Sequence, residues 1–155
     1  MDSSTLNVFT EDVIRDAVFG LGVLSIVLLF TSTLFIRIFI AFNRYCHQRE
    51  FCSSLDLTLR FMIAILLICV VQVCSILIWT AAIYMIGLVK NLNLAMLFAG
   101  SCYTTLGIFN ATLPDGWRST AFYIAFSGLF SFALATSSMI SMLSTINKKL
   151  IQIKY

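Results

Sequence analysis

The stretch FMIAILLICVVQVCSILIWTAAIYMIGLV, at positions 61–89, decides the fold class because it contains no charged residue. Two further runs without a charge occupy positions 17–36 and 119–147. Each run reaches the roughly 20 apolar residues that a helix needs to cross the hydrocarbon core of a bilayer. The sequence therefore predicts an all-α membrane protein with three transmembrane helices.

The composition of the whole chain agrees with this prediction. Of its 155 residues, 60% are hydrophobic and 11% are charged, and the mean hydropathy is +0.98. A soluble globular domain is closer to half apolar and about a quarter charged. These values exclude a soluble domain, and the low charge together with 14% aromatic residues excludes intrinsic disorder.

A fourth uncharged run, at 91–114, differs in character from the other three. Its first half, Leu92 to Ala99, is apolar enough for a helix, whereas Gly100 to Gly107 is small and polar. Half a span followed by a polar loop is typical of a re-entrant segment, whose irregular backbone is buried in protein or lines a wet cavity. We expect residues 92–109 to enter the membrane and return on the same side.

The charged residues beside the spans predict their orientation. The basic residues that flank the spans are Arg37, Arg44, Arg49 and Arg60 between the first two, and Lys148, Lys149 and Lys154 after the last. Basic flanks are typical of the cytoplasmic side of a membrane. Three spans with a re-entrant segment therefore place the N-terminus outside and the C-terminus in the cytoplasm, whereas four spans would place the C-terminal lysines outside.

The re-entrant segment has the chemistry of a site for monovalent cations. Backbone carbonyls and the hydroxyls of Thr104 and Thr105 are hard oxygen ligands that can replace the hydration shell of an alkali cation. The C-terminus of a half-helix, which carries the negative end of its dipole, favours a cation at the same place. No carboxylate lies in the segment, so a divalent ion is less favoured. A ring of carbonyls needs several copies of the chain, which implies a symmetric oligomer.

These residues resemble a known family. The stretch Ser101-Cys102-Tyr103-Thr104-Thr105-Leu106-Gly107 resembles the end of the pore helix and the start of the selectivity filter in potassium channels. It is similar to small prokaryotic pore-loop channels whose filter reads Thr-Thr-Leu-Gly-Tyr-Gly-Asp. The resemblance covers residues 60–146, because 78–84 resembles the end of the outer pore helix, Trp117-Arg118 resembles a pair that follows the filter, and 127–137 resembles the inner helix.

The resemblance implies a homotetramer with a potassium-channel-like pore for a permeant monovalent cation, potassium or sodium. The filter would consist of Thr104, Thr105, Leu106, Gly107, Ile108 and Phe109, with Asn110 and Asp115 at the pore mouth. Asp115 has an alternative role as the cap of the turn Pro114-Asp115-Gly116. Helical spacing places Ser131, Leu134 and Ser138 on one side of the last span. They would line a wet inner cavity or, alternatively, form a face for helix packing.

The chain departs from the family pattern after Gly107. The family continues with Tyr-Gly-Asp, whereas this chain continues with Ile108, Phe109 and Asn110. The family's second filter glycine adopts a conformation that is costly for a bulky residue such as Phe109. We therefore expect the inner half of the filter to form and the outer half to differ, with reduced selectivity for potassium.

The expected organisation follows from the spans and the resemblance together. An extracytoplasmic N-terminus at 1–16 precedes a peripheral transmembrane helix at 17–42, a cytoplasmic basic linker at 43–58, a pore domain at 59–147 and a short cytoplasmic tail at 148–155. Within the pore domain, the outer helix is expected at 59–89, the pore helix and filter at 92–110 and the inner helix at 118–147. Trp79, Tyr84 and Trp117 are interpreted as aromatic anchors at the membrane boundary.

Two functions from different classes are compatible with the sequence. The first is a pore-forming subunit in a cell (inner) membrane, with an unidentified accessory or gating protein as a possible partner. The alternative is a non-conducting relative that acts as a scaffold, an accessory subunit or a lipid- or ligand-binding protein. An enzyme is not expected, because no polar catalytic constellation lies in the spans, and neither a cofactor, a metal site nor a nucleic-acid partner is expected.

Overall fold

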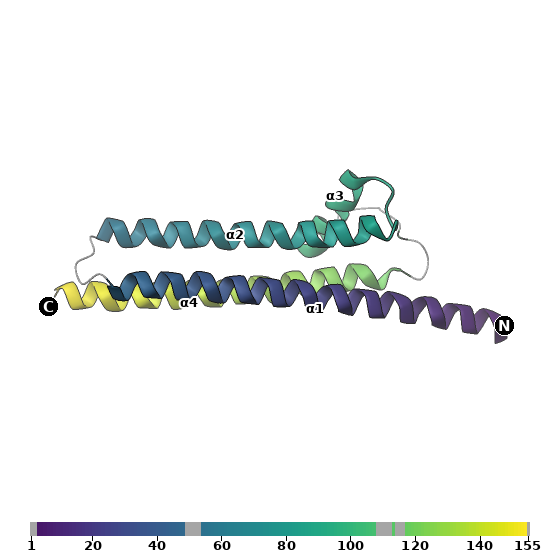
Figure 1. Cartoon of the computed structure of the whole chain (residues 1–155), viewed down its shortest axis with the longest axis horizontal. Coiled ribbons are helices and arrows are strands. Elements are labelled where there is room, and N and C mark those ends of the chain that lie inside the picture. The colour runs from purple at the N-terminus through teal and green to yellow at the C-terminus, as the bar shows by residue number, and fades with distance from the viewer. Residues whose placement is uncertain (1–2, 49–53, 108–112, 114–116, 155) are drawn as a thin grey trace. The chain divides into compact units, whose positions relative to one another are not determined.

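The computed structural model describes residues 3–48, 54–107, 113 and 117–154, and within these it consists of four helices. They are α1 (Ser3–Gln48), α2 (Ser54–Met85), α3 (Leu92–Tyr103) and α4 (Ser119–Lys154), as Figure 1 shows. Helical segments at Ile14–Gln48, Leu55–Met85 and Ser119–Ile151 are long and apolar enough to cross a membrane. The prediction of an all-helical fold with three helices long and apolar enough to span a membrane is confirmed for the described residues.

The long helices extend beyond the uncharged runs that predicted them. α1 continues to Gln48 and α2 begins at Ser54, so the described part of the segment expected as a linker, 43–58, is helical. α4 continues to Lys154, through most of the expected tail. Charged residues therefore occupy the ends of the helices, because helical hydrogen bonding does not stop where the apolar segment does.

α2 ends earlier than the uncharged run, and its end has a defined cause. Gly87 has a φ of 77°, a left-handed conformation that glycine adopts without steric cost. Its N–H donates to the carbonyl of Tyr84 at 3.0 Å, and the N–H of Leu88 donates to the carbonyl of Ile83 at 3.2 Å. These two bonds form a Schellman motif, which closes the helix after Met85.

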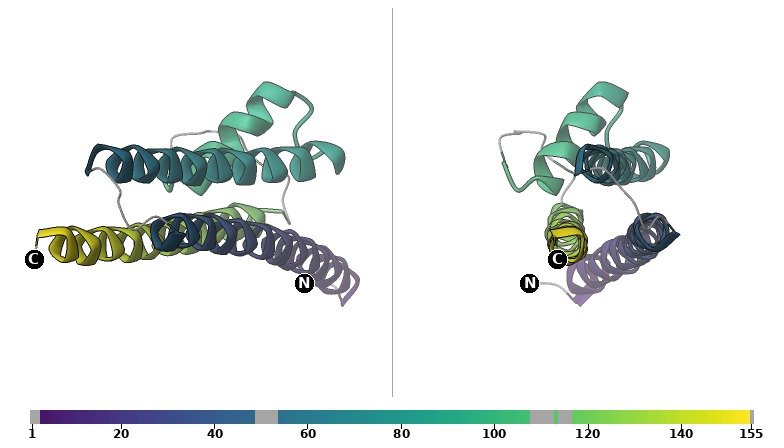
Figure 2. Two further views of the ribbon diagram at one scale, coloured as in Figure 1. Left: turned by 60° about the vertical axis from the view of Figure 1, so that its left-hand side comes forward. Right: turned by 90° about the vertical axis from the view of Figure 1, so that its left-hand side faces the viewer.

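The chain divides into two compact units, and each has its own apolar core. The first unit comprises residues 1–29 and 74–130, and the second comprises 30–73 and 131–155. The first unit therefore contains all of α3 together with the first part of α1, the end of α2 and the first part of α4. Figure 2 shows α3 crossing α2 obliquely in this unit.

The core of the first unit is built around the indole of Trp79. It contains Val27, Trp79, Ile83, Phe98, Ala99, Tyr103, Leu113 and Ile124. Trp79 is fully buried, and its Nε1 donates to Ser127 Oγ at 2.9 Å, while Ser127 Oγ donates to the carbonyl of Ile124 at 2.7 Å. The interpretation of Trp79 as a boundary anchor is therefore wrong, because its polar nitrogen is satisfied inside the protein rather than at a membrane surface.

A carboxylate is also buried in the first unit. Asp16 on α1 is 1% exposed, and it accepts hydrogen bonds from Thr120 Oγ1 at 2.6 Å and from the backbone N–H of Ser119 at 3.1 Å. These groups belong to the first turn of α4, where helical N–H groups lack intrahelical partners and the dipole favours a negative charge. Asp16 therefore caps α4 from a different helix, and the cap offsets the cost of burying the carboxylate.

Two glycines allow close contacts between helices of the first unit. A Cβ on Gly20 of α1 would overlap the ring of Tyr123 on α4. A Cβ on Gly128 of α4 would overlap the backbone carbonyl of Tyr103, the last residue of α3. Small residues let membrane helices approach one another closely, and here Gly128 lets the end of α3 lie directly against α4.

The core of the second unit is formed by the end of α1, the start of α2 and the end of α4. Its buried members are Phe35, Phe42, Cys46, Leu57, Ala64, Ile68, Val71, Ala135, Met142 and Ile146. The rings of Phe42 and Phe61 meet edge to face with centroids 6.5 Å apart. Polar contacts complete this unit: Tyr45 OH donates to Asp56 Oδ2 at 3.0 Å, and Thr145 Oγ1 donates to Asn43 Oδ1 at 3.4 Å.

We expect Gly128→Ala to weaken the packing of α3 on α4. The new Cβ meets a backbone carbonyl, which cannot rotate away, so the free energy of unfolding should fall by about 1–3 kcal/mol. Gly22→Ala is the matched control, because a Cβ on that helical glycine meets nothing within 4 Å. It should be neutral or stabilise by up to about 1 kcal/mol. Thermal unfolding in detergent micelles, followed by circular dichroism, measures both, and equal midpoints would contradict the contact.

Candidate functional site

The candidate site is α3 together with the segment Thr104–Gly107 that follows it. α3 begins at Leu92 because Asn91 caps it: the Asn91 side chain accepts from the N–H of Asn93 at 3.0 Å. Its 12 residues rise about 18 Å, which is shorter than the ~30 Å hydrocarbon core. α3 is therefore an apolar helix that is too short to cross a membrane by itself.

One face of α3 is buried in the first unit and the other is exposed. The buried residues are Ala95, Phe98, Ala99 and Tyr103, which recur at helical spacing. Behind this face, Gly100 lies near Ile76 of α2, where a Cβ would be 3.8 Å from the isoleucine Cγ2. The exposed large side chains are Leu92, Leu94, Met96 and Leu97. In a single chain, α3 therefore presents an apolar face that no described residue covers.

The C-terminus of α3 ends in a second Schellman motif. The N–H of Leu106 donates to the carbonyl of Ser101 at 2.9 Å, and the N–H of Thr105 donates to the carbonyl of Cys102 at 3.0 Å. Thr105 occupies the position that Gly87 occupies at the end of α2, and it has a φ of 59°. A β-branched residue in this left-handed conformation is strained, since its Cβ crowds the backbone.

The hydroxyls expected to serve as filter ligands are used inside the chain. Thr104 Oγ1 donates to the carbonyl of Gly100 at 2.8 Å, and Thr105 Oγ1 donates to the carbonyl of Thr104 at 2.7 Å. Both side chains are nevertheless exposed, as are Leu106 and Gly107. The segment 104–107 is thus a helix cap in the single chain. Four of the residues expected in the filter and at the mouth lie outside the described residues: Ile108, Phe109, Asn110 and Asp115.

Two carbonyls at the end of this cap are left without a donor by the described residues. Within the described part of the chain, no group donates a hydrogen bond to the carbonyls of Leu106 and Gly107. Both residues are exposed, and they follow the C-terminus of α3, where the helix dipole is negative. The arrangement therefore offers neutral oxygen ligands and a favourable field to a cation.

The residues expected to line an inner cavity lie in different environments. Ser131 is fully buried, Leu134 is 38% exposed and Ser138 is half-buried. Ser138 Oγ donates to the carbonyl of Leu134 at 2.8 Å, whereas Ser131 Oγ has no partner among the described residues. In a single chain, Ser131 therefore belongs to the packing face of α4, and Leu134 faces away from the second unit's core.

An aromatic ridge, defined by Phe122, Phe126 and Phe130, runs along α4 in the first unit. The three side chains are 41–62% exposed, and successive ring centroids are 5.4 and 5.2 Å apart. Rings at i and i+4 stack along one side of a helix, so the ridge is continuous over two turns. It is a second apolar surface of the first unit that the described chain leaves uncovered.

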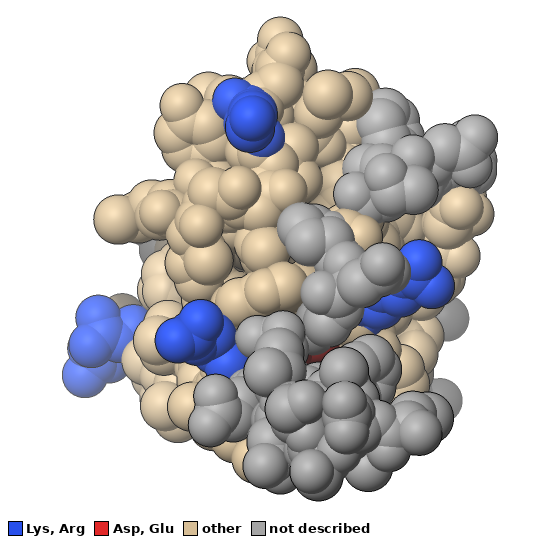
Figure 3. All heavy atoms as spheres, turned by 90° about the vertical axis from the view of Figure 1, so that its right-hand side faces the viewer, with Lys and Arg blue, Asp and Glu red and all other residues tan. Residues whose placement is uncertain are grey.

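Charged and metal-binding groups are sparse around the site. Arg15, Lys90 and Arg118 are exposed residues of the first unit. Figure 3 shows lysine and arginine side chains in separate groups on a largely uncharged surface. In the described residues, no three His, Cys, Asp or Glu side chains gather as they would around a metal ion. The candidate site therefore offers a cation backbone oxygens rather than a cluster of charged ligands.

No protein-family model, curated protein or solved structure matches this chain. The resemblance to pore-loop channels therefore depends on the motif and on the order of the helices. Sequence reasoning missed the cap at Thr105 and the burial of Asp16. The signal for the cap was available, since a helix ending in Gly100-Ser101-Cys102-Tyr103 is followed by two threonines and then by Gly107.

We expect Thr105→Gly to stabilise the protein, because glycine adopts the left-handed conformation of this cap without crowding. The free energy of unfolding should rise by about 1 kcal/mol. Gly87→Thr is the reciprocal variant at the equivalent position of α2. It should lower the free energy of unfolding by a similar amount. Thermal unfolding in micelles measures both. A lower midpoint for Thr105→Gly would mean that Thr105 does not adopt the capping conformation in the folded protein.

We expect two buried serines of α4, one turn apart, to respond in opposite directions. Ser127→Ala removes the acceptor of the Trp79 Nε1 hydrogen bond and should cost about 1–3 kcal/mol of unfolding free energy. Ser131→Ala removes a buried hydroxyl that has no partner among the described residues, so it should be neutral or stabilising. Chemical unfolding of each variant provides the comparison. A loss at Ser131 as large as at Ser127 would indicate that its hydroxyl has a partner, such as water in a cavity.

Proposed function

We propose that this chain is the pore-forming subunit of a tetrameric cation channel, potassium-channel-like but with an altered filter. One observation carries the proposal: a helix too short to cross a membrane lies between two candidate spans and is followed by two exposed residues, Leu106 and Gly107, whose carbonyls accept no hydrogen bond from any described residue. This is the order of elements in a pore domain. The proposal places the channel in a cell (inner) membrane, with the N-terminus outside and the C-terminus in the cytoplasm.

The proposed pore forms where four copies of the segment 104–109 surround a common axis. Carbonyls such as those of Leu106 and Gly107 would then replace part of the hydration shell of a potassium or sodium ion. A monovalent ion is favoured because the described part of the segment carries no carboxylate. Transport would be passive, down the electrochemical gradient, and an accessory or gating protein remains part of the proposal.

Two uncovered apolar surfaces support self-assembly. The exposed face of α3 and the aromatic ridge of α4 both lie in the first unit, which also contains the segment Thr104–Gly107. Apolar faces of membrane helices can also be covered by lipid, so assembly depends on packing rather than on removal from water. In a tetramer, the ridge would be covered by a neighbouring copy, and α1 would remain at the periphery.

One observation favours the alternative of a non-conducting scaffold, accessory subunit or ligand-binding protein. The Schellman motif uses the carbonyls of Ser101 and Cys102, and both threonine hydroxyls are bonded within the chain. A conducting filter needs its oxygen atoms free to face an ion. In the non-conducting alternative, the cap would persist in the assembled protein.

Flux of potassium and sodium from liposomes that contain the purified full-length chain separates the two functions. We expect both ions to pass, with weak preference between them. Thr105→Ala should lower the flux by about tenfold, since the net value of one hydroxyl ligand is near 1.4 kcal/mol. Thr33→Ala, at an exposed threonine of α1, is the matched control and should leave the flux unchanged.

Two results would contradict the channel. Absence of flux from protein that is helical and tetrameric in the same detergent would favour the non-conducting alternative. Equal flux in the Thr105→Ala and Thr33→Ala variants would show that ions do not pass through the segment that contains Thr105. Phe109→Gly extends the test, because it restores a glycine where the family has one.

A further inference from the structure

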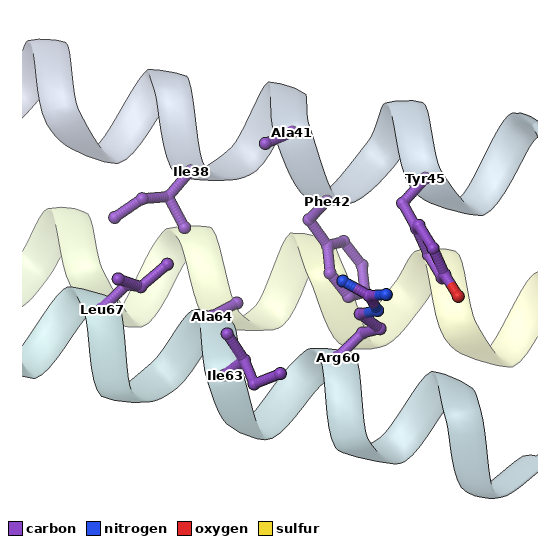
Figure 4. Close-up of a pocket in the computed structure, with 8 residues that line it drawn as sticks. All are labelled: Ile38, Ala41, Phe42, Tyr45, Arg60, Ile63, Ala64 and Leu67. Carbon is purple, nitrogen blue, oxygen red and sulfur yellow. The ribbon is translucent and has the colours of Figure 1, made fainter.

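A groove between α1 and α2 in the second unit has a volume of about 170 Å³. It is lined by Ile38, Ala41, Phe42, Tyr45, Arg60, Ile63, Ala64 and Leu67, as Figure 4 shows. At one end the lining is aliphatic, with Ile38 of α1 opposite Leu67 of α2. At the other end it is polar, with Arg60 beside the aromatic rings of Phe42 and Tyr45. The groove therefore has an apolar part and a cationic end.

The position of Arg60 is fixed by its neighbours. Its guanidinium carbon lies 4.1 Å from the centroid of the Tyr45 ring, which is a cation–π contact. Tyr45 is itself held by Asp56, since its hydroxyl donates to Asp56 Oδ2 at 3.0 Å. Arg60 thus lines the groove beside Tyr45, and no hydrogen bond to a described residue engages its guanidinium, so its donors are available to a ligand.

A second hollow continues the groove along α1. It has a volume of about 370 Å³ and is lined by Arg37, Ile40, Ala41, Arg44, Tyr45 and Gln48. The two hollows share Ala41 and Tyr45, so they adjoin each other. Arg37 and Arg44 are seven residues apart, which places them on one side of α1, about 10 Å apart along its axis.

The arginines lie where the apolar segments end. Arg37 directly follows the uncharged run 17–36, and Arg60 directly precedes the uncharged run 61–89. Arg37, Arg44 and Arg60 are all exposed, and among the described residues no carboxylate forms an ion pair with any of them. Arginine at the end of a membrane helix extends its guanidinium toward the headgroup region.

We propose that these two hollows form a binding site for one anionic phospholipid. The headgroup phosphate would accept hydrogen bonds from Arg60 and Arg44, whose planar guanidinium groups suit phosphate oxygens. The first part of an acyl chain would lie in the aliphatic end of the groove, between Ile38 and Leu67. The rest of the lipid would remain in the bilayer. The site lies in the second unit and does not depend on whether the first unit conducts ions.

Charge and shape together select this occupant. A zwitterionic lipid offers the same apolar chain, but its ammonium group would approach three arginines. Free phosphate would satisfy the arginines and leave the aliphatic end of the groove empty. An anionic lipid complements both ends of the site.

Native mass spectrometry of the full-length chain in detergent tests the proposal. The protein is supplied with equal amounts of phosphatidylglycerol and phosphatidylcholine that carry the same acyl chains. We expect phosphatidylglycerol to be retained preferentially. The triple variant Arg37→Gln, Arg44→Gln, Arg60→Gln should lose at least about tenfold of this retention, because each basic residue near a membrane surface contributes about fivefold.

Two controls separate the site from general charge and from folding. The triple variant Arg15→Gln, Lys90→Gln, Lys148→Gln removes the same charge at exposed residues elsewhere and should retain the lipid as the unmodified chain does. Ala41→Phe fills the region common to both hollows without removing charge, and it too should lower retention by at least about tenfold. Ala41 is exposed, so the substitution does not alter the buried core of the second unit. Circular dichroism verifies that the variant has the helix content of the unmodified chain.

The proposal is overturned by any of four results. Equal retention of the two lipids would show that the site does not distinguish an anionic from a zwitterionic headgroup. Equal losses in the two triple variants would show that any basic residue suffices. Displacement of the lipid by millimolar glycerol phosphate would show that a soluble anion is sufficient to occupy the arginines. Unchanged lipid retention in the Ala41→Phe variant would show that the groove plays no part in binding.

Discussion

The close approach of Gly128 to the carbonyl of Tyr103 is the constraint on which the architecture of the first unit depends. A spanning helix is held in place by the thickness of the bilayer, but a 12-residue helix is not. α3 must be positioned by contacts, and its last residue lies against α4 at a point where no Cβ fits. The adjacent residue, Ser127, receives the indole N–H of Trp79 from α2. One turn of α4 therefore holds the end of α3 and the end region of α2 together.

The oxygen atoms at the C-terminus of α3, next to this contact, either accept hydrogen bonds within the cap or would be exposed to a ligand if the cap opened. In the single chain, the cap at Thr105 satisfies carbonyls of α3 within the helix end, and the Thr105 hydroxyl bonds to Thr104. Releasing that hydroxyl costs about 1 kcal/mol, and leaving the left-handed conformation returns a similar amount. Leaving the cap also breaks the two hydrogen bonds of the Schellman motif, so the capped form is the locally favoured one in the single chain. In the proposed pore, contacts with neighbouring copies or an ion would have to supply this difference in free energy.

The sequence predicted what depends on length and composition, and failed where distant residues determine the outcome. The three candidate spans and the short α3 follow from the uncharged runs and from the polar residues after Ala99. The burial of Trp79 does not, because α2 is apolar on all sides and its pattern does not reveal which side faces the core. Nor does the cap made by Asp16, whose partner Thr120 is 104 positions away. The expected filter role of Thr105, Leu106 and Gly107 stays a prediction, and the cap geometry was not anticipated because turn conformation depends on how the chain continues.

The buried carboxylate of Asp16 and the exposed arginines of the second unit lie in different environments. Asp16 is buried, and both of its carboxylate oxygens accept hydrogen bonds from the first turn of α4, so the protein itself supplies partners for this group. Arg37, Arg44 and Arg60 are exposed beside an apolar groove, and the nearby carboxylate of Asp56 is engaged by Tyr45. Within the described chain, nothing of opposite charge pairs with these arginines. Guanidinium groups at the end of a membrane helix lie at the depth of lipid phosphates. The anionic phospholipid that we propose for this groove would supply the counter-charge that these arginines lack among the described residues.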